Sequence, residues 1–328
     1  MHIKILFFGT SNFAVPILQK LIDEKYNIAA VVTQPDKPTG RKQTLTPSPI
    51  KILAAKLGIP LLQPEKLRDN FKILTLNFQL IITASYGKII PKKILDLPKF
   101  GALNVHPSLL PKYRGSSPIQ NAILNGDKKT GVTIMMMDEK MDHGPILAQE
   151  EKNIDEKQNF DRLHDELSKL GAELLIKTIP QWISCDIKPT PQGYVAGTAN
   201  RAVYPTYTKI IKKEDGKIDW TKSAIEIERQ IRAFTHWPGC WTIYKMDGKE
   251  KRVKIIEAVL GTKRLSHLIK PGQIFKTENK KMTVKCGKDF LEIKKLQIEG
   301  KKEMSGEDFL RGYSKLFLEG LPQNFMLK

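Results

Sequence analysis

Asn104 and His106 stand at the end of a short apolar segment, Ala102–Val105, that is expected to form a β-strand. Side chains two positions apart on a strand project from the same side, so the amide and the imidazole would lie together. Ligands of open α/β sheets bind outside the carboxyl ends of the strands. An amide and an imidazole there can stabilise a carbonyl oxygen that becomes negatively charged. A single histidine at a strand end is, however, often only a hydrogen-bonded structural residue.

A carboxylate, Asp142, lies in the loop after a second apolar segment, Val132–Met136. If the two strands are neighbours in one sheet, Asp142 extends toward the same crevice and can orient His106. The competing interpretation is a turn aspartate that bonds to its own backbone. Asn104, His106 and Asp142 are therefore the candidate catalytic residues, and the surrounding elements decide whether they meet.

The first half of the chain alternates two patterns. Apolar runs typical of buried strands are followed by segments whose apolar residues recur at helical spacing. This alternation predicts an α/β domain with a parallel sheet and crossover helices. The expected strands are Ile3–Phe8, Asn27–Thr33, Leu80–Ala84, Ala102–Val105 and Val132–Met136, and the expected helices are Phe13–Ile22, Pro49–Leu57 and Leu163–Lys177.

The pattern changes near residue 188. Prolines and glycines without periodicity mark 188–206 as a linker between a first domain, 1–187, and a second domain, 207–328. The second domain begins with an amphipathic helix, Ala224–Phe234, and continues in short alternating segments separated by turns, which predict a small antiparallel β-barrel. These segments are Cys240–Tyr244, Val253–Glu257, Gln273–Phe275, Met282–Lys285 and Phe290–Lys294.

The charge of the chain favours a polyanionic partner. Its 328 residues carry a formal net charge of +19, and residues 207–328 hold 27 Lys and Arg against 16 Asp and Glu. Lysines that neutralise phosphates release counterions, so a basic barrel attached to an enzyme domain suits a nucleic-acid-binding arm. The alternative is a lysine-rich composition that only aids solubility.

Several classes of protein fit the sequence poorly. Three cysteines without C-x-x-C spacing argue against a disulfide framework or a zinc site and indicate a reducing compartment. The first apolar run is too short for a signal peptide or a membrane span. The turn Gly9–Ala14 has Ser11 and Ala14 where a dinucleotide fingerprint has glycines. We expect a cytoplasmic monomer that has no metal and does not associate with membranes.

The run Asn104–Gly115, N-V-H-P-S-L-L-P-K-Y-R-G, with D-x-G at Asp142–Gly144, resembles the folate-dependent formyltransferases. Further segments resemble the methionyl-tRNA formyltransferases within that family. They are F-x-G-T-x-x-F-A at Phe7–Ala14, T-Q-P-D-K-P-x-G-R at Thr33–Arg41, A-S-Y-G-K-I-I-P at Ala84–Pro91, and I-D-W and R-A-F-x-x-W-P at 218–220 and 232–238. Pro107 and His143 depart from the family pattern beside His106 and Asp142.

The resemblance implies a Rossmann-like catalytic domain followed by an OB-like barrel. It implies transfer of a formyl group from 10-formyltetrahydrofolate to methionyl initiator tRNA, with Asn104, His106 and Asp142 as catalytic residues. It further implies that Arg41, with Lys42 beside it, reads the acceptor stem of the tRNA. The segment that it assigns to the folate comprises Ser108, Leu109, Leu110 and Pro111.

Two other functions stay open on the sequence. A formyltransferase that acts on an amino sugar or a glycinamide nucleotide would share the three candidate catalytic residues but would not need the basic loop and the basic barrel. A non-catalytic tRNA-binding protein would not need the intact set of Asn104, His106 and Asp142.

Overall fold

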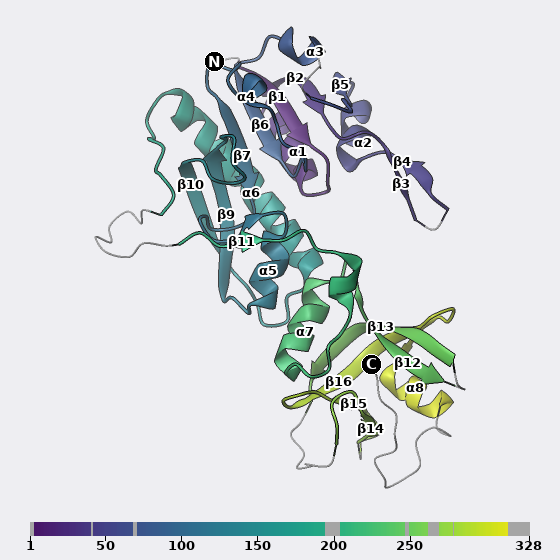
Figure 1. Cartoon of the computed structure of the whole chain (residues 1–328). Helices are drawn as coiled ribbons and strands as arrows, with labels where there is room; N and C mark the ends of the chain where they lie inside the picture. Colours follow the sequence, from purple (N-terminus) through teal and green to yellow (C-terminus); the bar gives the residue numbers. More distant parts are fainter. Residues whose placement is uncertain are drawn as a thin grey trace. The chain divides into compact units, whose positions relative to one another are not determined.

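The computed structural model describes residues 3–40, 42–67, 71–193, 204–246, 249–261, 269–277 and 279–313. The chain divides into two compact units (Figure 1). None of the described helices is both long and apolar enough to cross a membrane. Unit 1 comprises Met1–Ile119, Lys128–Ile154 and Arg162–Lys209, and unit 2 comprises Gln120–Asp127, Asp155–Asp161 and Ile210–Lys328.

Unit 1 is built on a seven-stranded sheet in the order β10-β9-β7-β6-β1-β2-β5. The strands from β7 to β5 pair in parallel, as the sequence predicts. All of them except the two-residue β5 match expected strands. They are β1 (Lys4–Gly9), β2 (Asn27–Val32), β5 (Leu61–Leu62), β6 (Leu80–Ala84) and β7 (Ala102–His106).

The other two strands, β9 (Lys129–Met136) and β10 (Ile146–Asn153), run antiparallel to their neighbours, which the sequence did not indicate. The loop 137–145 joins them without a helix, and such a direct connection gives an antiparallel pair. The register of β9 with β7 sets Met136 opposite Leu103, so β9 ends beside the start of β7. The loop 137–145 must therefore run back along β7 to reach the carboxyl end of that strand.

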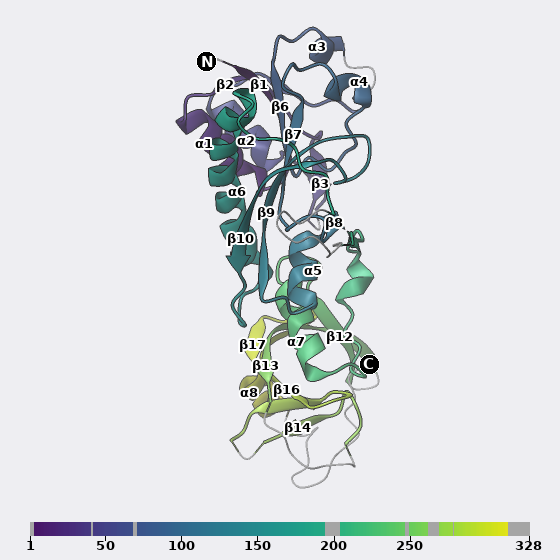
Figure 2. The ribbon, with the colours of Figure 1, turned by 90° about the vertical axis from the view of Figure 1, so that its left-hand side faces the viewer.

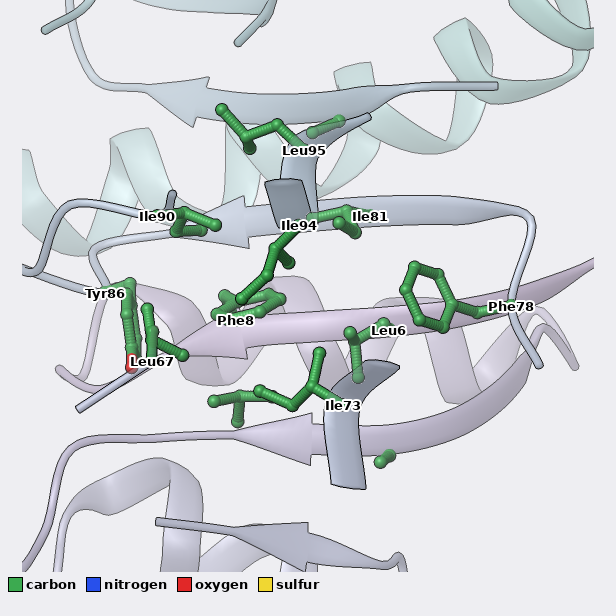
Figure 3. Packing of buried hydrophobic residues seen from close by; sticks show 13 residues of the cluster. Leu6, Phe8, Leu67, Ile73, Phe78, Ile81, Tyr86, Ile90, Ile94 and Leu95 are labelled. Atoms are coloured by element: carbon green, nitrogen blue, oxygen red, sulfur yellow. The ribbon is translucent and has the colours of Figure 1, made fainter. Parts of the chain in front are cut away.

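Helices cover both faces of the sheet (Figure 2). On one face lie α1 (Ala14–Asp23) and α6 (Phe160–Ile183), where Gly171 of α6 packs directly on Val105. On the other face, α3 (Phe71–Leu74) and α4 (Lys92–Leu95) bury an apolar cluster against the strands (Figure 3). The remaining helices of this half of the chain are α2 (Pro49–Lys56), which Ser48 caps, and α5 (Pro118–Leu124).

Unit 2 holds a six-stranded antiparallel sheet in the order β12-β13-β16-β15-β14, with β17 paired to β16. This confirms the predicted antiparallel sheet of the second half, in contrast to the largely parallel sheet of the first. Its strands are β12 (Cys240–Met246), β13 (Lys249–Leu260), β14 (Ile274–Lys276), β15 (Met282–Lys285), β16 (Phe290–Ile298) and β17 (Glu303–Ser305); its helices are η1 (Lys213–Gly216), α7 (Ala224–Ala233) and α8 (Gly306–Gly312).

Side chains of α7 contact two earlier segments, Gln120–Asp127 and Asp155–Asp161, and these contacts explain why both segments belong to unit 2. Arg232 forms a paired salt bridge with Glu228 and donates to the carbonyl oxygen of Gln158 at 2.8 Å. The guanidinium of Arg229 packs on Gly126, where a Cβ would lie 2.1 Å from Cζ of Arg229. Sequence patterns within α7 predict the helix but give no sign of these partners.

Candidate active site

Asn104 and His106 project from the face of β7 that also carries Ala102, a member of the apolar cluster under α3 and α4. Val105 points to the opposite face and packs against α6. The same face of β7 therefore contributes to the apolar core at Ala102 and to the polar site at Asn104 and His106. Thr83, the register partner of Asn104 on β6, adds a buried hydroxyl without a hydrogen bond in the described part of the chain.

Asp142 contacts both predicted partners. Its Oδ1 lies 3.4 Å from Nδ2 of Asn104 and 3.6 Å from Nδ1 of His106. Its Oδ2 accepts a 2.7 Å hydrogen bond from the backbone N–H of Gly115. The side chains of His106 and Asp142 are only 5% and 15% exposed, so water screens their interaction weakly. The structure thus brings the three candidate catalytic residues together.

The second nitrogen of His106 determines where its protons lie. Nε2 is 3.0 Å from the backbone oxygen of Tyr113, and a carbonyl oxygen can only accept. Nε2 therefore carries a proton, and Nδ1 is the nitrogen that faces Asp142. When His106 holds a second proton, that proton sits on Nδ1 between the ring and the carboxylate.

The loop of Asp142 is shaped by its own neighbours. Asp142 has a backbone φ of +48°, a left-handed conformation that is uncommon for a residue with a side chain. A Cβ at Gly144 would lie 2.0 Å from the carbonyl oxygen of Met136, so this position excludes any side chain. Nδ1 of His143, which replaces a residue of the family pattern, lies 2.7 Å from Oδ2 of Asp138 on the exposed side of the loop.

The predicted folate segment, Ser108–Pro111, is a turn that packs against β9. Oγ of Ser108 donates to the carbonyl oxygen of Lys112 at 2.6 Å. Oγ1 of Thr133 donates to the backbone oxygen of Ser108 at 2.6 Å and accepts from the N–H of Leu110 at 3.1 Å. Ser108, Leu110 and Pro111 are buried and Leu109 is half-buried, so these residues form a fixed wall next to His106.

The predicted tRNA loop is a β-hairpin of β3 (Lys37–Thr39) and β4 (Thr44–Thr46) that projects beyond β2 and β5 (Figure 1). Lys42 is exposed in its turn, and Arg41 lies outside the described residues. At the base of the hairpin, Nζ of Lys51 bonds Oδ2 of Asp36 at 2.7 Å. Hydrogen bonds from Lys51 and Gln63 lower the pKa of Asp36, which keeps this brace ionised.

Three of the segments noted in the sequence meet at one backbone atom. The carbonyl oxygen of Tyr86 accepts from Oγ1 of Thr10 at 3.0 Å and from Nε2 of Gln34 at 2.6 Å. Burial raises the pKa of the Tyr86 hydroxyl to about 12, so it stays neutral. Gly9 ends β1 with no room for a Cβ, which would approach Phe7 to 2.7 Å. The glycine turn therefore serves the packing between β1 and α1.

The structure also gives contacts at the site to Arg114 and Gly115, which end the motif Asn104–Gly115, and to Gln192, which the sequence did not point to. Gly115 holds the carboxylate of Asp142, and Gln192 donates to the backbone oxygens of Asp142 and Gly144. Arg114 is 6% exposed, and its guanidinium donates to Oε1 of Gln192. Gln192 falls in the stretch interpreted as a linker, where a glutamine carries no recognisable signal. Within the described residues, no group of three or more His, Cys, Asp or Glu side chains could hold a metal ion.

Comparisons with known proteins show the family of the chain. Residues 1–179 match the formyl transferase family, and residues 210–314 match the formyl transferase C-terminal domain. The chain is 45% identical over 313 residues to the methionyl-tRNA formyltransferase of Bacillus velezensis, covering 94% of each chain. It is 40% identical over 331 residues to that of Caldanaerobacter subterraneus, covering 99% of this chain and 100% of the relative.

A solved structure shares the fold. WlaRD, a sugar 3N-formyl transferase crystallised in the presence of dTDP and 5-N-formyl-THF, is 24% identical with a TM-score of 0.62. The match covers 92% of this chain and all of WlaRD. With both parts of the chain matched and relatives at this identity over nearly its whole length, the chain belongs to the formyl transferase family and, within it, to the methionyl-tRNA formyltransferases.

Proposed function

We propose that this chain transfers a formyl group from 10-formyltetrahydrofolate to the α-amino group of methionyl initiator tRNA, for translation initiation. The observation that carries the proposal is the convergence of the side chains of Asn104 and His106 on Oδ1 of Asp142. Acyl transfer to an amine needs hydrogen-bond donors for an oxyanion and a group that moves protons. The similarity to methionyl-tRNA formyltransferases supports the choice of substrates.

In the proposed reaction the methionyl amine attacks the formyl carbon, and the carbonyl oxygen becomes an oxyanion. Asn104 and the protonated Nδ1 of His106 stabilise that oxygen, and one such donor contributes about 2.7–4 kcal/mol. The bond between the formyl carbon and the folate nitrogen then breaks. The amine loses one proton and the folate nitrogen gains one, and Asp142 with His106 provides the path for it.

The substrates would approach from two sides of this centre. We infer that the donor lies along the fixed wall made by Ser108, Leu109, Leu110 and Pro111, whose internal hydrogen bonds support a preformed surface. Arg41 and Lys42, at the projecting hairpin, would contact the acceptor stem. The proposed division is a catalytic domain over 1–187, a linker over 188–206 and a tRNA-binding domain over 207–328, acting as a monomer in the cytoplasm.

One assay tests the function. The purified protein is incubated with 10-formyltetrahydrofolate and either methionyl initiator tRNA or methionyl elongator tRNA, and formylmethionine is quantified after deacylation. We expect formylation of the initiator tRNA and little of the elongator tRNA. Formylation of a nucleotide-linked amino sugar or a glycinamide nucleotide, with neither tRNA modified, would indicate another acceptor. Binding of tRNA without any transfer would indicate a non-catalytic protein.

A further inference from the structure

Gln192 lies 50 residues beyond Asp142 in the sequence, yet its side chain reaches the loop of Asp142. Its Nε2 donates to the backbone oxygen of Asp142 at 2.9 Å and to that of Gly144 at 2.8 Å. A primary amide has two N–H donors, and both are used on this one loop. The two contacts flank His143 and hold the backbone on each side of it.

The other end of the amide is held by a buried cation. Oε1 of Gln192 accepts from Nε of Arg114 at 2.9 Å and from Nη2 at 2.7 Å. Arginine has no acceptor, so it fixes the amide with its oxygen toward Arg114 and its nitrogen toward the loop. Nη1 of Arg114 lies 3.2 Å from the hydroxyl of Tyr207. The guanidinium is thus held by neutral partners, and the orientation of Gln192 is set.

Arg114 and Gly115 together hold Asp142 at two points. Gly115 donates directly to the carboxylate, and Arg114 acts through Gln192 on the backbone. The left-handed backbone of Asp142 is disfavoured for a residue with a side chain, so it needs such external contacts. Without them, the loop would relax and Oδ1 would move away from Asn104 and His106.

We propose that Gln192 is a positioning residue of the formyl-transfer site, which holds the carboxylate of Asp142 against His106 and Asn104. This inference rests on the proposed function. Gln192 and the pair Tyr207–Thr208, which forms β11 against β8 (Arg114–Gly115), flank the chain segment that leads toward the second matched domain. Gln192, which the sequence places in the linker 188–206, therefore contributes a contact to the catalytic site.

The test uses two substitutions that change the amide in different ways. Gln192→Glu keeps the acceptors for Arg114 but removes both donors and sets a carboxylate against two carbonyl oxygens. Gln192→Met keeps the length and removes all the hydrogen bonds. The control, Gln297→Met in unit 2, removes a 3.0 Å bond from a glutamine to the backbone oxygen of Lys301.

The measurement is the single-turnover rate of formylation with enzyme and donor in excess over methionyl initiator tRNA. When the folded enzyme saturates the tRNA, a lower folded fraction leaves the rate constant unchanged, so a merely structural role would not alter it. We expect a loss of about 10- to 100-fold for both Gln192 variants, since misplacement of a reacting group by about 1 Å has effects of this size. Gln297→Met should match the unmodified protein.

Two outcomes separate the inference from the function that it rests on. If the unmodified protein formylates the tRNA and both Gln192 variants stay within twofold of its rate, Gln192 does not position the site. If the unmodified protein itself transfers no formyl group, the proposed function fails. Donor affinity, measured by equilibrium binding, should change less than threefold in both variants, because Gln192 contacts the loop rather than the donor wall.

Discussion

At the scale of single residues, the direction of each hydrogen bond limits the chemistry. Nε2–H of His106 donates a hydrogen bond to the backbone oxygen of Tyr113, so only Nδ1 is available toward Asp142. Asn104 presents Nδ2 to the same carboxylate oxygen. Nδ2 of Asn104 and Nδ1 of His106 therefore both face Oδ1 of Asp142, and Nδ1 becomes a second donor when it carries a proton. An oxyanion formed beside Asp142 would meet donors that need little reorientation.

The amide of Asn104 is the most direct test of this arrangement. Asn104→Ala removes the donor, and we expect kcat to fall about 100- to 1000-fold, as when one oxyanion donor is lost. Asn104→Asp should lower kcat at least as much, because a second carboxylate would then face Asp142. Formylation kinetics at saturating substrates measure both. The control is Asn77→Ala, at a surface asparagine whose Oδ1 accepts a 2.9 Å hydrogen bond from Gln79. Near-normal turnover by a folded Asn104→Ala variant would remove Asn104 from the mechanism.

At the scale of elements, the hairpin β3–β4 forms a two-stranded sheet of its own, apart from the sheet that carries β7. Its base is fixed by the pair Asp36–Lys51 and by a 2.8 Å bond between the hydroxyls of Thr33 and Ser48. Its turn is exposed at Lys42. A braced base with an exposed lysine in its turn suits contact with a phosphate backbone. Such contact would not involve Ser108–Pro111, the wall proposed for the donor.

We therefore expect Lys42→Ala, alone or with Arg41→Ala, to raise KM for methionyl initiator tRNA several-fold while KM for the donor stays within twofold. The reason is that exposed lysines contribute to tRNA binding through phosphate contacts. Steady-state kinetics with each substrate varied in turn provide the measurement. Lys56→Ala, at an exposed lysine at the end of α2, is the matched control. Equal losses for both substrates would count against the hairpin as a tRNA element.

The elements also show what sequence can predict and why. Ile3–Phe8 and Leu80–Ala84 were predictable because strands buried on both faces are continuous apolar runs. β10 was not, because I-L-A-Q-E-E-K-N begins apolar and then turns polar at an edge of the sheet. The direction of β9 is a pairing property that no local pattern encodes.

The residues of the candidate site also divide into those that the sequence predicts and those that it does not. Asn104 and His106 were predictable as a pair because strand periodicity places them on one face. The meeting with Asp142 was expected from neighbouring strand ends, but it arises from a loop that runs back from an antiparallel strand. Gln192 was not predictable, since its partners are backbone oxygens 48 and 50 residues away.

At the scale of the whole molecule, the three cysteines differ in solvent exposure between the two units. Cys185 is exposed after α6, whereas Cys240 and Cys286 are buried in unit 2. Burial raises the pKa of both buried thiols, and that of Cys286 to about 12. At pH 8, well below these values, both remain protonated and shielded, and the thiolate is the reactive form.

We expect a chromogenic disulfide reagent at pH 8 to titrate one thiol quickly in the native protein and all three in denaturant. Cys185→Ser should remove the fast reaction. Slow labelling of Cys240 and Cys286 with one shared rate would show that unit 2 opens as a single cooperative body. Rapid labelling of either buried cysteine in the native protein would contradict the packing of β12 or of the turn after β15.

The charge of the chain is also a property of the whole molecule, and two explanations of it differ in one measurable respect. If the excess of Lys and Arg in residues 207–328 serves tRNA phosphates, the logarithm of affinity falls linearly with the logarithm of salt concentration. About four phosphate contacts give a loss on the order of 100-fold between roughly 50 and 200 mM salt. If the lysines only aid solubility, the affinity for tRNA changes little over this range.

We expect the steep response, measured as tRNA affinity by filter binding or fluorescence anisotropy at several salt concentrations. Lys212→Ala with Lys213→Ala, at two exposed lysines beside η1, should weaken binding and reduce the salt slope by roughly 1 to 2, since each phosphate contact contributes about 0.7–0.9. Arg252, whose guanidinium lies 4.1 Å from the ring centroid of Trp241, keeps its charge while stacked and should contribute similarly. A flat response would leave the solubility explanation standing and would remove residues 207–328 from tRNA recognition.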